Sequence, residues 1–341
     1  MKFLTLQISR QLVNTFCSSK NCLLVLIFFL VVQPVYGVKV IECPDDDTYI
    51  YEDTVLTGGF CNVEDSLDSD YGVIIIKADN IVLDCNGTVL NGSGYDFKEY
   101  PRYRFGIVNI KHRNVEIKNC VVQNFFDGIL LIKTKHCKIH NNTLRDNNNG
   151  IVIDNTYPYY EEKIEKRNFT QIPSPGYNHV YDNLLVSNSQ GINLIFTMNN
   201  LVFGNEIHNS VHGILVQGSH KNTITANKIY NSFLVDVSFT ENSTNNTVIG
   251  NVLLSEKAVS TKEGSYNLII GNIIKKPVSL VLDWTDSKFM NTYLGEESGG
   301  IESRREIKII KTGFKNFLIE NVNLVLGLIV CIAGFFITKF L

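Results

Sequence analysis

Three side chains in the middle of the chain have the chemistry that acid–base catalysis needs. Asp127 and His212 each precede a glycine, and Asp154 lies four residues beyond another. A glycosidase uses two carboxyl groups about 5 to 9.5 Å apart, whereas a lyase or epimerase needs a base and a charge-stabilising cation. We therefore take Asp127, Asp154 and His212 as candidate catalytic residues.

A repeat must position these side chains. Two columns recur about every 22 residues, and each glycine of the first column opens a run rich in Ile, Leu and Val. The columns are Gly106, Gly128, Gly150, Gly191 and Gly213, and Asn142, Asn183, Asn205, Asn227, Asn251 and Asn272. This period predicts a solenoid with three short strands per coil and Asn or Gly corners, where left-handed backbone costs little. Its inward ladder would be Ile107, Ile129, Ile151, Ile192 and Ile214.

The repeats resemble the right-handed parallel β-helix family, which includes NosD-type periplasmic proteins and carbohydrate-binding and sugar-hydrolase domains. The resemblance rests on residues 78–92, Ala-Asp-Asn-Ile-Val-Leu-Asp-Cys-Asn-Gly-Thr-Val-Leu-Asn-Gly, and on the Asn-x-Ile and Gly-Ile-x-Leu repeats that follow. It implies an all-β fold, but it says little about function, because this coil carries lyases, epimerases, hydrolases and adhesins alike. A leucine-rich repeat does not fit, since its Leu-x-x-Leu-x-Leu framework is missing.

The cysteines predict disulfides rather than a metal site. Related β-helix proteins often have a pair like Cys43 and Cys61, so the resemblance implies a bond there. Cys85 and Cys120 fall near equivalent corners of neighbouring coils, where a second bond is possible, and Cys137 has the phase of a buried thiol. No Cys-x-x-Cys or Cys/His spacing indicates a metal or cofactor site. The NosD likeness implies copper, but the chain has only three methionines and its seven histidines share no ladder.

The two ends of the chain predict export and anchoring. Residues 22–32 are apolar after a basic segment, as in a secretory signal. Residues 324–338 are uncharged and approach the roughly 20 residues that span a bilayer. The alternatives are an uncleaved N-terminal anchor and a buried C-terminal helix. The expected organisation is a signal peptide at 1–37, an N-terminal cap at 38–77, the β-helix at 78–294, a hinge and basic stalk at 295–321 and a transmembrane anchor at 322–341.

Two insertions, 92–105 and 157–176, break the period. Because the strands beside them stack in one sheet, they would form two walls of a groove over its outer face. Their tyrosines could offer flat rings to sugars, with Arg102, Arg104, Glu161 and Glu162 adding polar selection. These tyrosines are Tyr95, Tyr100, Tyr103, Tyr157, Tyr159 and Tyr160. The alternative is that they only pack the loops onto the solenoid.

Two functions remain open. With a net charge of −3 and no basic stripe, nucleic acid is not an expected partner. We favour a non-catalytic, membrane-anchored surface module that binds a glycan or an envelope protein. Turn geometry already explains the corner Asn and Asp residues, and the outward face is apolar at Val108, Leu130, Val152 and Leu215. The alternative is a polysaccharide lyase, epimerase or glycoside hydrolase. Six sequons are possible glycan attachment points, at Asn86, Asn91, Asn141, Asn168, Asn242 and Asn245.

Overall fold

The structure is a computed structural model that describes residues 38–63, 72–94, 104–156, 174–261, 264–275, 280–281 and 288–293. The expected signal peptide, basic stalk and C-terminal anchor lie outside these residues. Only the ends of the two insertions are described. Within the described ranges, no helix is long and apolar enough to cross a membrane. The strands from Ile41 onward belong to one compact unit.

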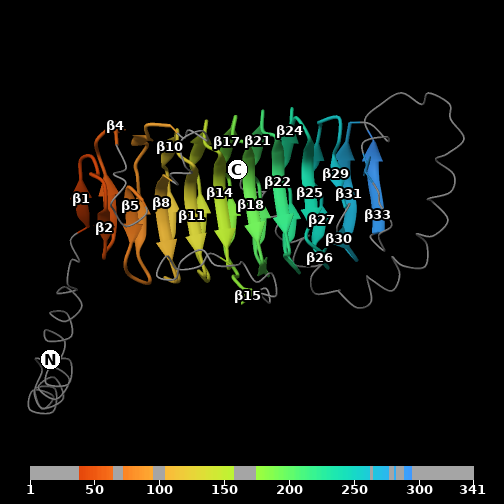
Figure 1. Cartoon of the computed structure of the whole chain (residues 1–341), viewed down its shortest axis with the longest axis horizontal. Helices are drawn as coiled ribbons and strands as arrows, with labels where there is room; N and C mark the ends of the chain where they lie inside the picture. The colour runs from red at the N-terminus through yellow and green to blue at the C-terminus, as the bar shows by residue number, and fades with distance from the viewer. Residues whose placement is uncertain are drawn as a thin grey trace, which may run out of the picture. The chain divides into compact units, whose positions relative to one another are not determined.

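That unit is a parallel β-helix, in which each coil contributes one strand to each of three ladders (Figure 1). The first ladder is a ten-stranded parallel sheet. Its strands are β2 (Thr48–Ile50), β5 (Ile74–Ile76), β8 (Phe105–Ile110), β11 (Asp127–Ile132), β14 (Asn149–Asp154), β18 (Gln190–Ile195), β22 (His212–Gln217), β25 (Val235–Thr240), β29 (Val259–Ser260) and β32 (Leu280–Val281). The predicted all-β solenoid is therefore present.

The other two ladders join through the long strand β31. One contains β3 (Thr54–Leu56), β6 (Val82–Asp84), β9 (Glu116–Lys118), β12 (Lys138–His140), β16 (His179–Tyr181), β20 (Leu201–Phe203), β23 (Thr223–Thr225), β27 (Thr247–Ile249), β31 (Leu268–Ile274) and β33 (Lys288–Tyr293). The other contains β4 (Phe60–Asn62), β7 (Val89–Asn91), β10 (Val121–Gln123), β13 (Thr143–Arg145), β17 (Leu184–Val186), β21 (Glu206–His208), β24 (Lys228–Tyr230) and β28 (Val252–Leu253). Short strands β15 (Ser174–Pro175), β19 (Thr197–Met198), β26 (Ser243–Thr244) and β30 (Gly264–Ser265) pair at a corner, and β1 spans Lys39–Ile41. Residues 38–77, expected as a cap, thus already supply strands that pair with the coils.

The core runs along the axis of the solenoid. Register pairs Ile107 with Ile129, Ile129 with Ile151, Ile151 with Ile192 and Ile192 with Ile214, and all five side chains are fully buried. This confirms the predicted inward ladder. Full burial of one such side chain contributes about 1.5–3 kcal/mol, so the stack is a main source of stability.

The glycine column marks close approach between coils. A Cβ atom built on Gly128 would lie 2.8 Å from the carbonyl oxygen of Gly150 on the next coil and 3.1 Å from Leu144. A Cβ on Gly191 would lie 2.5 Å from the oxygen of Gly213. These positions therefore exclude side chains because the neighbouring backbone occupies the space.

The asparagine column forms a buried hydrogen-bonded ladder. The Asn205 Oδ1 atom accepts from the backbone N–H of Asn183 at 3.1 Å, and its Nδ2 atom donates to Val180 O at 2.9 Å and to Asn227 Oδ1 at 2.9 Å. Left-handed backbone falls one residue before these asparagines, at Asn141, Gly204, Gly250 and Gly271 and also at Ala226 (φ 53°). The predicted Asn or Gly corners are therefore present, directly beside the ladder residues. A second ladder, unforeseen from the sequence, contains Asn178, Asn200, Asn222, Asn246 and Asn267.

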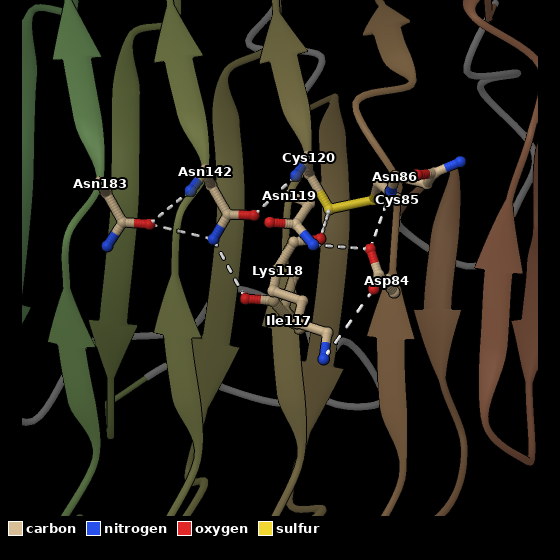
Figure 2. The surroundings of a disulfide bond; sticks show 9 residues. All are labelled: Asp84, Cys85, Asn86, Ile117, Lys118, Asn119, Cys120, Asn142 and Asn183. Atoms are coloured by element: carbon tan, nitrogen blue, oxygen red, sulfur yellow. Dashed lines mark hydrogen bonds and ion pairs between the residues drawn. A yellow bond between two sulfur atoms is a disulfide. The ribbon is translucent and has the colours of Figure 1, made fainter.

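A disulfide continues the first asparagine ladder toward the N-terminal coils. Figure 2 shows Cys120 and Cys85 bonded next to Asn142, whose Oδ1 atom accepts from the Cys120 N–H at 2.9 Å. The expected Cys43–Cys61 bond is also present, and a side chain on Gly58 would collide with both of its sulfur atoms. Cys137 is a buried free thiol, as predicted.

Candidate functional site

The outer face of the ten-stranded sheet changes character along the solenoid. At its β8 and β11 end, outward side chains form an apolar cluster separate from the main core, comprising Phe105, Val108, Leu130, Ile132 and Val152. This confirms the predicted apolar outward face there. Over β14, β18 and β22, which lie side by side in Figure 1, polar side chains appear among outward apolar residues such as Val152 and Leu215. We call Asp127, Asn149, Gln190, Asn193 and His212 the polar row.

The repeat itself places the row. Asp127, Asn149, Gln190 and His212 each begin a strand of this sheet directly before a column glycine. Register pairs Asp127 with Asn149, Asn149 with Gln190 and Gln190 with His212. Since each step is about 4.8 Å, Asp127 and His212 lie about 14 Å apart along the stack. The structure therefore aligns these two predicted residues without bringing them into contact.

Asp127 is a buried carboxyl group with a raised pKa. Its side chain is only 2% exposed. Burial raises its pKa to about 7; the hydrogen bond from Asn149 opposes this shift, and the negative charge of Asp154 adds to it. Asn149 Nδ2 donates to Asp127 Oδ1 at 2.6 Å. Asp127 is therefore poised to hold or release a proton near neutral pH.

Polar atoms without partners recur along the row on the strands that follow Asp127. Asn193 Nδ2 donates to Gln190 Oε1 at 2.6 Å. The buried atoms Asn149 Oδ1, Asn193 Oδ1 and His212 Nδ1, however, have no hydrogen-bond partner among the described residues. Burial also lowers the pKa of His212, which favours its neutral ring. Buried polar atoms in native proteins are nearly always paired, so these three indicate a place where a ligand or water completes the bonds.

Asp154 stands at the far end of the same face. Register pairs it with Ile132, five positions beyond Asp127 on β11, which is about 16 Å of strand. Its Oδ1 atom accepts from the backbone N–H and the hydroxyl of Thr156, each at 2.6 Å. Its carboxylate thus closes the turn after β14. The predicted pair Asp127 and Asp154 stays at opposite strand ends, although the charge of Asp154 still acts on Asp127.

Most of the ligand-binding side chains predicted in the two insertions lie outside the described part of the chain. The six tyrosines, together with Arg102, Glu161 and Glu162, lie outside the described residues. Arg104 is half-buried immediately before β8. Sequence reasoning missed Asn193, yet a signal exists, because Asn193 is polar in a column that holds Val152 and Leu215 on either side.

Comparisons with solved structures show the fold. DFA-IIIase from Arthrobacter chlorophenolicus A6 is 12% identical, with 70% of this chain and 67% of that chain covered and a TM-score of 0.48. A mutant of that enzyme is 12% identical, the alignment covers 74% of each chain, and the TM-score is 0.50. Tailspike protein 2 from an Escherichia coli O157:H7 bacteriophage gives 11% identity, 75% of this chain, 38% of that chain and a TM-score of 0.49. A search among curated protein sequences finds no match.

A family model described as periplasmic copper-binding protein (NosD) matches residues 62–279. The described residues do not fit a copper site, because none of their His, Cys, Asp and Glu side chains form a group of three that could hold a metal ion. Two histidines on other faces have protein partners instead, with His112 bound to Asp79 at 3.0 Å and His140 to Glu116 at 3.3 Å. The match nevertheless covers more than half of the 341 residues, and the chain belongs to the NosD family of parallel β-helix proteins.

Proposed function

We propose that this NosD-family protein binds carbohydrate on the outer face of its ten-stranded sheet, through the polar row. One observation carries the proposal: Asn149 Oδ1, Asn193 Oδ1 and His212 Nδ1 are buried and have no partner within the described residues. Each unsatisfied buried atom costs about 1–3 kcal/mol. Sugar hydroxyl groups, which donate as well as accept, would satisfy them.

Recognition without turnover is the favoured form of this function. Asp127 and His212 are separated by three strand spacings. Asp154 accepts two hydrogen bonds from Thr156. A general acid and its partner must both reach the reacting bond, and this arrangement does not converge on one point. The six insertion tyrosines would extend the binding surface by stacking on sugar rings.

A glycan-acting enzyme is the second candidate, and the pKa of Asp127 favours it. A carboxyl group with a pKa of about 7 is still protonated in half the molecules at neutral pH. Protonated Asp127 would give its proton to a glycosidic oxygen as the C–O bond breaks, and a water molecule would supply hydroxide to the anomeric carbon. Hydrolysis of this kind also needs a second carboxylate within about 9.5 Å to take the proton of that water. Asp154, the predicted partner, lies about 16 Å of strand away, so the pair Asp127 and Asp154 does not meet this requirement.

The protein would work outside the cytoplasm. Two disulfides within the described body, Cys43–Cys61 and Cys85–Cys120, suit an oxidising compartment. The signal peptide at 1–37, the stalk at 295–321 and the membrane anchor at 322–341 belong to the same proposal, as does attachment at the cell surface. Its partners would be a polysaccharide or an envelope glycan or protein, together with the membrane.

A glycan array probed with the full chain tests the function, with mass spectrometry of the bound glycans to detect products. We expect binding without products, weakened at least ten-fold by Asn193→Leu. The matched variant Thr223→Val, which removes a half-buried outward hydroxyl from β23, should bind like the parent. Products that disappear in Asp127→Asn would establish the enzyme instead. A chain that binds no glycan would overturn both candidates.

A further inference from the structure

The described strands of the outer face carry few charged side chains around the polar row. Among the outward positions of β8, β11, β14, β18, β22 and β25, the only charged side chains are Asp127 and Asp154, and none is Lys or Arg. Arg104 before β8, and Lys111 and Lys133 after β8 and β11, stand at the rims of the apolar end. The outward positions of these described strands therefore offer no cation to pair with a carboxylate, sulfate or phosphate ligand.

The two amide atoms of the row that lack a partner among the described residues are both acceptors. One N–H of Asn149 bonds to Asp127, and one N–H of Asn193 bonds to Gln190. Their carbonyl oxygens remain, and both side chains are more than nine-tenths buried, with exposures of 8% and 5%. A carbonyl oxygen accepts hydrogen bonds but cannot donate. These two oxygens can therefore receive donors such as hydroxyl groups, whereas an ionised carboxylate has no hydrogen to give them.

Apolar side chains border these acceptors. Val152 and Leu215 flank Asn193 in the same outward column, on the strands before and after it. Both are buried, at 2% and 5% exposure. A ligand here would meet the acceptor oxygen of Asn193 between the apolar side chains of Val152 and Leu215. This combination suits a sugar ring, which has hydroxyl groups at its edge and C–H groups on its faces. Desolvating an anion against this surface without a paired cation would be costly.

We propose that the polar row selects a neutral saccharide over an acidic one. The proposal rests on the carbohydrate binding proposed above and adds the class of ligand. Asn149 and Asn193 accept hydroxyl hydrogens, the unpaired His212 nitrogen takes a third hydrogen bond, and the ring packs on Val152 and Leu215. At the outward positions of the described strands, Asp154 and the ionised form of Asp127 repel uronate, sulfate and phosphate groups.

Matched pairs of oligosaccharides test this selectivity. Each pair, built on glucose, galactose or mannose, differs only at C6, which is a hydroxymethyl group in one member and a carboxylate in the other. Titration of the full chain should show at least ten-fold tighter binding of the neutral member. His212→Lys should weaken binding of the neutral member. It should also reduce the ratio of neutral to acidic affinity at least three-fold, because it replaces the unpaired nitrogen with a cation. His208→Lys, the same change on β21 of another sheet, should leave the ratio unchanged.

The outcomes separate the two proposals. Equal or tighter binding of the acidic member, or a His212→Lys ratio equal to that of the parent, would overturn the selectivity and leave carbohydrate binding intact. Binding of neither member in any pair would overturn both. Thermal unfolding of each variant shows that it is folded before its binding is interpreted.

Discussion

Asn149 and Asp127 are joined across two successive coils, with the Asn149 amide donating to Asp127 Oδ1 at 2.6 Å. This bond uses the side-chain donor that faces Asp127 and leaves Asn149 Oδ1 without a partner in the described part of the chain. It also stabilises the charged form of Asp127, but burial outweighs it and the pKa stays at about 7. An open acceptor on Asn149 therefore lies beside a carboxyl group that burial causes to titrate near neutrality.

Asp127 should make stability depend on pH. Its folded pKa of about 7 lies above the ordinary aspartate value of 3.8, so the folded chain binds more protons and stability falls as pH rises from about 4 to 7. The full difference is about 4 kcal/mol. Asp127→Asn should remove this part of the fall. Urea unfolding at pH 4, 5.5, 7 and 8 measures it. Asp236, whose pKa is raised to about 6, titrates in the same range. Its contribution is common to both chains, so the difference in unfolding free energy between parent and variant reports Asp127 alone. Parallel pH profiles would contradict the burial of Asp127.

The asparagine ladder should be a major source of stability. Asn205→Ala removes donors to Val180 O and Asn227 Oδ1 and the acceptor for the Asn183 N–H. Because buried groups on both neighbouring coils lose their partners, the free energy of unfolding should fall by about 3 kcal/mol. Thr223→Ala, at a half-buried outward position, should change it by less than about 0.5 kcal/mol. Similar losses in both variants, measured by urea unfolding, would argue against the ladder.

The two disulfides should differ in their contribution to stability. Cys85–Cys120 spans 35 residues and Cys43–Cys61 spans 18. In the chain-entropy model, their loss costs about 4 and about 3 kcal/mol respectively. Paired replacement by alanine, followed by unfolding without reductant, measures each cost. If adding reductant destabilised the Cys85→Ala/Cys120→Ala chain as much as the parent, this bond would contribute nothing to the folded parent.

Cys137 should be unreactive in the folded protein. It is a buried free thiol whose pKa burial raises to about 11, and only the thiolate form attacks alkylating reagents at an appreciable rate. Iodoacetamide at pH 8 should leave the Cys137 peptide unmodified, and the same treatment in 6 M guanidinium should modify it fully. Peptide mapping by mass spectrometry follows the site, and rapid modification of the folded chain would contradict its burial.

The fold was predictable because a solenoid repeats its constraints. Each coil places Gly128, Gly150 or Gly191 against the backbone of the next coil, so the same residue type recurs at the same phase and the period appears in the sequence. The inward isoleucines recur for the same reason. The second asparagine ladder was harder to see because its first asparagine, Asn178, follows the insertion. On the coil before it, Cys137 occupies the equivalent position, and the Cys137 N–H donates to Asn178 Oδ1.

The candidate site was less predictable because it departs from the repeat. The column of Asp127, Asn149, Gln190 and His212 was visible in the sequence, but turn geometry was enough to explain it. Which polar atoms lack partners depends on contacts between coils, such as the bond that occupies the Asn193 amide with Gln190. Sequence spacing cannot show those contacts.

Asn193→Leu offers the most direct test of carbohydrate binding at the polar row. Leucine continues the apolar column between Val152 and Leu215 and removes an unpaired buried oxygen, so the free chain should be at least as stable as the parent. Calorimetric titration of both full chains with the tightest neutral glycan from the array should show binding by the parent and at least ten-fold weaker binding by Asn193→Leu. A folded Asn193→Leu chain that binds as tightly as the parent would contradict a binding site at the polar row.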